Sequence, residues 1–209
     1  VRIRMLRRIG PLIDCDGGHV IRGQSVLMHI GLSRQCKGGR YRQAVRLLVL
    51  RMGDISQGRL HAVSQACEAI VASDAQHIEA ELSGRYLLDR PALDAEALHV
   101  NSAFMTAVAN DYGYDHVYVR ALQAKAQKGD ILIVLSTSGN SLNIINAVYQ
   151  AREMGLFVIG MTGSKGGKIA QLCDILINVP SDNTPRIQEA HIMIGHIICQ
   201  GIETSIFSL

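Results

Sequence analysis

The sequence has few cysteines, and they are poorly placed for cross-links or for a metal ribbon. There are five, an odd number, widely spaced and without a C-x-x-C pair. This pattern provides neither the disulfide framework of a small secreted protein nor a zinc ribbon. We therefore expect reduced, partly buried thiols.

Long hydrophobic runs are also missing. No stretch approaches the roughly 18 consecutive apolar residues that span a bilayer, and the opening VRIRMLRRIG lacks the apolar core of a secretory signal. Hydrophobic residues nevertheless make up 48% of the 209 residues, which is enough for one substantial core. These features predict a soluble, cytoplasmic protein with no membrane partner.

Charge is divided unevenly along the chain. Residues 1–70 hold twelve Lys and Arg against four Asp and Glu, a net charge of +8, whereas residues 71–209 hold nine against fourteen, a net charge of −5. Glycines interrupt the apolar runs of the first region, and only residues 41–52 have a helical rhythm. We predict a basic region over 1–70, helical or poorly ordered, and a domain over 71–209. Because the basic region lacks interleaved aromatic residues, we expect no nucleic-acid partner.

Short apolar runs alternate with helical patterns from about residue 97 onward. Fully apolar strands separated by helices favour a parallel sheet covered on both faces, so the predicted fold is a three-layer, doubly wound α/β class with its core over 95–205. For the helix around His77, Ser73 or Asp74 is the expected N-cap, and Gly84 lies near its end. The predicted strands are 97–101, 130–136, 156–162 and 174–180, and the predicted helices are 73–86, 140–155, 166–173 and 183–206.

A polar stretch, STSGNS, follows one of the predicted strands and leads into a helix. At such a place the backbone N–H groups of a helix start, together with hydroxyl side chains, can bind a phosphate. The alternative is that Asn140 or Ser141 only caps the helix, and spacing alone does not decide between them. Neither G-x-G-x-x-G nor G-x-x-x-x-G-K-[ST] occurs, which argues against dinucleotide and P-loop sites.

Histidines and a carboxylate form a second group of candidate residues. His77 and Glu81 are four residues apart on a predicted helix, so they share a face and could share a metal ion or a proton path. An ordinary exposed pair is the alternative.

In the last predicted helix, His191 and His196 point about 140° apart and are not expected to serve one site. Gln188 and His196 lie within about 80° of each other but about 12 Å apart along the axis. Their joint use would need a frayed helix start or ligands from two subunits.

Five motifs together resemble a known family. DAQHIEAELSGR, VANDYGYD, LSTSGNS, MTGSKGGK and TPRIQEAHIMIGH occur in this order. With them, residues 73–205 closely resemble the sugar-isomerase (SIS) domain of bacterial phosphoheptose isomerases. Those enzymes convert sedoheptulose 7-phosphate to D-glycero-D-manno-heptose 7-phosphate, a precursor of ADP-heptose and of the lipopolysaccharide core. The resemblance implies an aldose–ketose isomerase with one zinc per subunit, a homotetramer whose active sites lie at subunit interfaces.

The resemblance also implies roles for individual residues. Glu81 and His196 would be the acid/base pair beside the metal, and the family's serine-rich loop would hold the phosphate. The implied zinc ligands are His77, Glu81, Gln188 and His196, and the implied substrate-binding residues are Ser136, Thr137, Ser138, Ser141, Asp111, Arg85 and Gln188.

Just before His77 the sequence departs from the family pattern. Family members have a segment of the type GKVLVCGNGGSA there, whose Asn, Gly and Ser help to hold the substrate, whereas this chain reads VSQACEAIVA over 63–72. A reading-frame slip is one explanation, since eleven Arg against one Lys in residues 1–70 would fit out-of-frame translation. A divergent N-terminal region is the other.

The missing segment leaves two functions to consider. We expect a weak or inactive isomerase, because a misplaced sugar slows the reaction steeply. The alternative is a non-catalytic SIS protein that binds a sugar phosphate or a replication-initiator partner. The presence of both His77 and Glu81 favours the enzyme, whereas the absence of the Gly-Asn-Gly-Gly-Ser loop favours the alternative.

Overall fold

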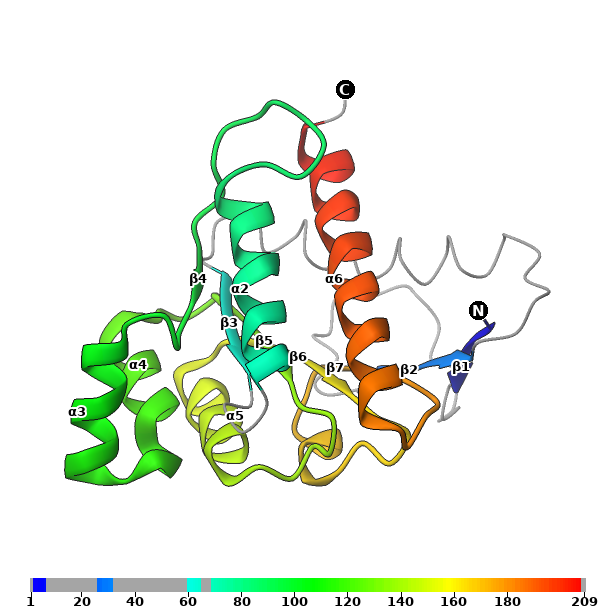
Figure 1. Cartoon of the computed structure of the whole chain (residues 1–209). Coiled ribbons are helices and arrows are strands. Elements are labelled where there is room, and N and C mark those ends of the chain that lie inside the picture. Colours follow the sequence, from blue (N-terminus) through cyan, green and yellow to red (C-terminus); the bar gives the residue numbers. More distant parts are fainter. Residues whose placement is uncertain (1, 7–25, 32–59, 65–68, 208–209) are drawn as a thin grey trace, which may run out of the picture.

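The computed structural model describes residues 2–6, 26–31, 60–64 and 69–207 (Figure 1). Its centre is a sheet with the strand order β1-β2-β7-β6-β5-β3-β4. The β1–β2 pair is antiparallel, and the other pairs are parallel. The strands are β1 (Arg2–Leu6), β2 (Val26–Gly31), β3 (Leu60–Ser64), β4 (Ala95–Ala97), β5 (Ile131–Leu135), β6 (Phe157–Thr162) and β7 (Ile175–Asn178).

Helices cover both faces of this sheet. α2 and α6 pack on one face, and α3, α4 and α5 pack on the other (Figure 1). This confirms the predicted three-layer α/β class. The helices are α2 (Ala69–Ser83), α3 (Ser102–Tyr112), α4 (Val117–Lys125), α5 (Leu142–Met154) and α6 (Thr184–Phe207), with short 3₁₀ turns η1 (Tyr114–His116) and η2 (Lys168–Gln171).

The strand β5 shows why the central strands are continuous apolar runs. Every residue of β5 is buried. Ile131, Ile133 and Leu135 belong to the core beneath α2 and α6, whereas Leu132 and Val134 belong to the core beneath the other helices. Because successive side chains of a strand point to opposite faces, a sheet covered on both sides needs apolar residues at every position.

The order of the strands places a switch point beside β5. Along the chain the sheet grows from β3 outward to β4, then returns across β3 to β5 and continues to β6 and β7. The direction therefore reverses between β3 and β5. Ligands of open α/β sheets bind at the carboxyl ends of the strands beside such a point. The serine-rich stretch follows β5 here.

The strand predicted over 97–101 is wrong for most of its length. β4 ends at Ala97, and Asn101 caps α3 by accepting a hydrogen bond from the Phe104 N–H at 3.0 Å. Leu98 lies in the turn but is buried in the core. The apolar character of this run therefore reflects burial of a turn rather than a strand.

The predicted N-cap of α2 is also wrong, although Gly84 follows its last residue as expected. The helix already includes Ala69, so Ser73 and Asp74 lie inside it. The reason is packing: Val71 and Ala75 are fully buried and continue the apolar stripe of the helix toward its start. Tertiary contacts override the capping preference of a serine here.

The prediction of a helical or poorly ordered region over 1–70 is wrong for the parts that the structure describes before residue 65. β1, β2 and β3 are strands of the central sheet, with β2 beside β7 and β3 between β5 and β4. The parallel partners of β2 and β3 lie more than 30 residues away in the chain, and β1 joins the sheet through β2. Local sequence patterns therefore do not reveal these strands. The helix predicted over 41–52 lies outside the described residues.

The remaining predicted helices and strands agree better with the structure. The segment 166–173 forms only η2, while α5, α6, β6 and β7 lie where they were predicted to within a few residues. The division into regions 1–70 and 71–209 stays a prediction. In the part of the chain that the structure describes, no helix has both the length and the hydrophobicity needed to cross a membrane.

Candidate active site

Three of the four predicted metal ligands lie together between α2 and α6. The Nε2 atoms of His77 and His196 are 3.0 Å apart, and Nε2 of His77 is 3.3 Å from Oε1 of Glu81. One ligand atom from each of the three residues lies within 4.8 Å of the other two. We call this group the His–Glu–His cluster. It joins the predicted pair on α2 to a residue 119 positions later on α6.

Close packing of the two helices brings these residues together. Gly195 precedes His196, and a Cβ atom at this glycine would lie 2.6 Å from Cδ1 of Ile78. Ile78 follows His77 and is itself buried, with 1% of its surface exposed. The glycine therefore lets α6 approach α2 closely enough for the neighbouring histidines to meet.

The donor atoms of the cluster suit a divalent metal ion. Imidazole nitrogens and a carboxylate oxygen are ligands that zinc accepts. Two ring nitrogens at 3.0 Å need either a shared proton or a shared cation between them, since both carry lone pairs when unprotonated. The His77 side chain is 50% exposed and that of Glu81 24% exposed, so a small molecule can reach the cluster.

Gln188 lies on the same helix as His196 but earlier. α6 begins at Thr184, so Gln188 is already inside a regular helix and the frayed start considered above is not present. Its side chain is largely buried, with 6% of the residue exposed. Because about 12 Å along the axis separates Gln188 from His196, the helix does not place Gln188 in the cluster of its own chain, and its role as a ligand stays a prediction.

Arg85 and Asp111 remain apart from the cluster. Arg85 is exposed in the segment after α2, and Asp111 is exposed near the end of α3, where it accepts a hydrogen bond from Asn110. Among the described residues, no hydrogen bond or ion pair joins either side chain to the His–Glu–His cluster. Their roles in substrate binding stay predictions.

The serine-rich stretch over 136–141, called the serine loop below, is held by short-range hydrogen bonds. Ser136 is fully buried, and its Oγ accepts from the Gly139 N–H at 3.1 Å. Oγ of Ser138 accepts from the Asn140 N–H at 3.2 Å. Gly139 has a φ of 65°, a left-handed conformation that favours glycine. These contacts give the loop its own defined shape.

Neither Asn140 nor Ser141 caps α5 with its side chain. Ser141 occupies the N-cap position without a side-chain capping bond. The Asn140 amide instead donates to the Ser138 carbonyl and accepts from the Lys168 N–H, both at 3.0 Å. Side-chain capping of α5 therefore does not explain the polarity of the loop.

A second loop, residues 163–168, supports the serine loop from the side. The Gly163 N–H donates to the Thr137 carbonyl at 2.9 Å. A Cβ atom on Gly139 would overlap the Gly166 carbonyl, and one on Gly167 would overlap the Ser138 carbonyl. The two backbones touch where side chains would not fit, so the glycines of MTGSKGGK have a packing role.

Two buried titratable groups on the helices that carry the cluster have shifted pKa values. Burial raises the pKa of Asp74, on α2, to about 6, and the nearby His77 opposes this shift. Burial lowers the pKa of His191 to about 4, opposed by the Thr162 backbone. His191 is therefore neutral at pH 7, and the prediction that it does not share a site with His196 stays a prediction.

Sequence patterns missed three residues beside the cluster. The ring of Tyr86 stacks on that of His196, with centroids 5.6 Å apart and planes 24° apart. Arg90 and Glu203 form a buried ion pair that binds the Glu81 carbonyl and the Tyr86 N–H. Only Glu203 had a signal in the sequence, because its spacing of seven from His196 places both on one face of a helix. Tyr86 and Arg90 lie outside any helix or strand, where periodicity gives no information.

Comparison with known proteins first defines the class. Residues 71–163 match the family model described as SIS domain. This region contains the serine loop and the two α2 residues of the cluster, His77 and Glu81. The fold and the position of the loop at a switch point agree with this class.

Similarities to individual proteins then define the family. The phosphoheptose isomerase of Aneurinibacillus thermoaerophilus is 53% identical over 136 residues, which cover 65% of this chain and 69% of that protein. Solved phosphoheptose isomerases from Francisella tularensis (33% identity, TM-score 0.69) and Neisseria gonorrhoeae (39%, 0.67) each match 78% of this chain and 84% of theirs. The chain belongs to the phosphoheptose isomerase family, which consists of aldose–ketose isomerases.

Proposed function

We propose that this chain converts sedoheptulose 7-phosphate to D-glycero-D-manno-heptose 7-phosphate, an early step toward ADP-heptose and the lipopolysaccharide core. The observation that carries the proposal is the meeting of His77, Glu81 and His196 from two helices, on a chain that belongs to this enzyme family. A protein that only binds sugar phosphates has no need for an acid/base pair, so we do not favour that alternative.

The chemistry requires two pairs of proton transfers through an enediol. A base takes the proton from the carbon beside the carbonyl while an acid protonates the carbonyl oxygen; a proton then returns to the former carbonyl carbon while the neighbouring hydroxyl loses its proton to become the new carbonyl. An ionised Glu81 can only accept, which suits the first step, whereas the His196 imidazole can donate. Substrate phosphate would bind at the serine loop, through the hydroxyls of Thr137, Ser138 and Ser141 and the backbone shaped by Ser136.

Zinc is the proposed metal. His77, Glu81 and His196 would hold it, with Gln188 of another copy as a further ligand. When bound, the ion would stabilise negative charge on the substrate oxygens. The site would take one ion per subunit, and the chelating atoms named here would have to be deprotonated to bind it.

An oligomer completes this proposal. We infer an oligomer with active sites at subunit interfaces, because Gln188 is too far along α6 to join the cluster of its own chain, and the family resemblance implies that this oligomer is a homotetramer. Arg85 and Asp111 would reach the substrate in that assembly. We further propose a cytoplasmic enzyme whose partner is its sugar-phosphate substrate, with neither nucleic acid nor membrane as a partner.

The decisive experiment measures turnover of sedoheptulose 7-phosphate with zinc present. The chain as it stands is compared with a variant in which residues 67–72 are replaced by GNGGSA. We expect weak turnover in the first and higher turnover in the second, since the graft restores a substrate-holding loop. The graft also removes the fully buried Val71, so its folding is checked by thermal unfolding.

Either result is informative. Full activity in the unchanged chain would show that the loop is dispensable. If both proteins fold and neither turns over the substrate, the proposed function is wrong.

A further inference from the structure

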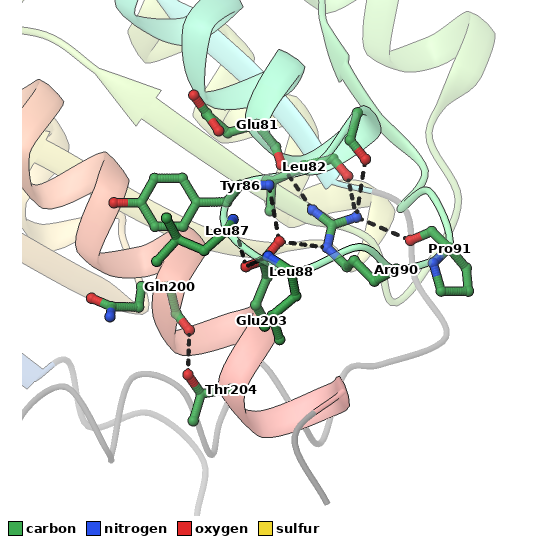
Figure 2. A network of polar contacts seen from close by, with 11 residues as sticks. Glu81, Leu82, Tyr86, Leu87, Leu88, Arg90, Pro91, Gln200, Glu203 and Thr204 are labelled. Carbon is green, nitrogen blue, oxygen red and sulfur yellow. Dashed lines mark hydrogen bonds and ion pairs between the residues drawn. The ribbon is translucent and has the colours of Figure 1, made fainter.

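The segment after α2 is tied to α6 by one buried carboxylate. Glu203 accepts hydrogen bonds from three successive backbone N–H groups (Figure 2). Oε1 accepts from Tyr86 at 2.9 Å, and Oε2 accepts from Leu87 at 2.9 Å and Leu88 at 3.0 Å. Three N–H donors to one ionised group fix the path of this segment closely.

Arg90 joins the same carboxylate to the end of α2. Its Nε donates to Oε1 of Glu203 at 2.9 Å. Its guanidinium nitrogens donate to the carbonyls of Glu81 at 2.8 Å and Leu82 at 2.9 Å, in the last turn of the helix (Figure 2). These carbonyls lack helical partners, and the end of a helix carries partial negative charge, so an arginine binds there favourably.

This ion pair is shielded from water. The side chains of Arg90 and Glu203 are 1% and 2% exposed, and the guanidinium also lies over the ring of Phe207, 5.5 Å from its centroid. Exposed ion pairs exchange partners with solvent, whereas a buried, fully hydrogen-bonded pair keeps a single geometry. We call Arg90 and Glu203 the buried clamp.

The clamp lies two turns from the His–Glu–His cluster. Glu203 and His196 are seven residues apart on α6, so they share a face about 10 Å apart along the axis. Tyr86 bridges this gap, because its N–H binds Glu203 while its ring stacks on His196. The backbone carbonyl of Glu81 is bound by Arg90 at the same time.

We propose that the buried clamp of Arg90 and Glu203 is a positioning device for the active site: it places the Tyr86 ring against His196 and thereby sets the orientation of that imidazole. This inference rests on the proposed function, in which His196 handles a proton. A purely structural ion pair would stabilise the fold without controlling the ring. The two roles differ in what happens to His196 when the clamp is weakened and the protein stays folded.

The first measurement reads the imidazole directly. In the full chain, labelled at histidine Cε1 and freed of metal by a chelator, the His196 signal is compared at one pH in the wild type, Tyr86→Leu and Glu203→Gln. A stacked aromatic ring shifts the signal of its neighbour, so Tyr86→Leu moves it. We expect Glu203→Gln to move it in the same direction, and the double variant to match Tyr86→Leu alone.

The second measurement is turnover of sedoheptulose 7-phosphate with zinc. We expect kcat to fall roughly tenfold or more in Tyr86→Leu and in Glu203→Gln, with KM changed by less than about twofold, since a misplaced catalytic group slows the chemical step more than it weakens binding. Arg152→Gln is the matched control. Arg152 also donates to a backbone carbonyl and faces a carboxylate, but on the exposed surface.

The outcomes separate the possibilities. The inference is overturned if Glu203→Gln folds and leaves the His196 signal unchanged, or if Arg152→Gln moves the signal equally. If Glu203→Gln does not fold, Arg90→Lys replaces it, because lysine keeps the charge but not the planar fork. The signal is read without substrate, so a wild type that lacks turnover would count against the proposed function alone.

Discussion

The serine loop and the His–Glu–His cluster are built in opposite ways. The loop is six consecutive residues, and its internal hydrogen bonds join positions two or three apart. The cluster joins residues 119 positions apart, through two helices that touch at Gly195. A site made of neighbours in the chain can be found from a motif. A site made by packing depends on how two helices are oriented.

The supports of the two sites differ as well. The serine loop is held by backbone contacts with the 163–168 loop, where glycines let the chains touch. The cluster is backed by a buried pair of opposite charges, Arg90 and Glu203. Shape therefore controls the first site, and charge contributes to the second. Substitutions should separate these dependences.

The largest expected effect is on the chemistry of the cluster. Glu81→Gln keeps the shape of the side chain but removes the base, so isomerisation should fall by roughly 10²–10⁴-fold while sugar-phosphate binding stays intact. Turnover assays and titration calorimetry measure the two properties. Glu79→Gln is the control, since Glu79 lies on another face of α2. Equal losses in both variants would remove Glu81 from its proposed role.

The buried clamp should make the stability of the folded protein fall at acid pH. Burial raises the pKa of Glu203, but hydrogen bonds from Leu87, Tyr86, Leu88 and Arg90 outweigh it, and the pKa is lowered. A carboxyl with a lowered folded pKa contributes stability that is present above its unfolded value, about 4.3, and is lost as the pH falls through the folded pKa.

Glu203→Gln tests this dependence. Leaving Arg90 buried without its anion should cost about 3–5 kcal/mol of unfolding free energy at pH 7. The variant should then lose less stability than the wild type between pH 5 and pH 3, an interval of about two units around the ordinary carboxyl pKa. Urea unfolding across this range measures both. Parallel pH curves for the two proteins would contradict the assignment.

The serine loop should respond in binding rather than in chemistry. Replacing Ser138 and Ser141 together with Ala removes two hydroxyls, at about 1–1.5 kcal/mol for each lost hydrogen bond, so sugar-phosphate binding should weaken several-fold where only one bond is lost and about a hundredfold where both are. Titration calorimetry measures the change, with Ser102→Ala on α3 as the control. Unchanged affinity would reject the loop as the phosphate site.

A pair of glycine variants separates the effect of shape from that of backbone conformation. Gly139 and Gly129 both have positive φ, at 65° and 94°, but a Cβ atom would overlap Gly166 at the first and meets nothing within 4 Å at the second. Both Ala variants should lose about 1–2 kcal/mol from the left-handed backbone. Only Gly139→Ala should lose a further 1–3 kcal/mol or so, together with phosphate affinity. Thermal unfolding of the pair compares them.

The helices and strands after residue 130 could be predicted from the sequence because their hydrophobic patterns are local. The buried run ILIVL and the apolar rhythm of α5 follow from a sheet covered on both faces. The run at 97–101 misled because Leu98 is buried in a turn, and Ser73 misled because Val71 extends the packed stripe of α2. The strands β1 to β3 depend on distant partners, which periodicity does not report.

The candidate site also has parts that follow from local sequence patterns and parts that depend on contacts between distant residues. The sequence by itself determined the serine loop, the His77–Glu81 pair on one helix face, and the family, because each is carried by residues close together in the chain. Only the tertiary structure decided that His196 meets that pair, that Tyr86 stacks on it, and that Arg90 and Glu203 stand behind both. Those contacts arise from the packing of α2 on α6, and packing depends on side chains far apart in the chain filling one common space.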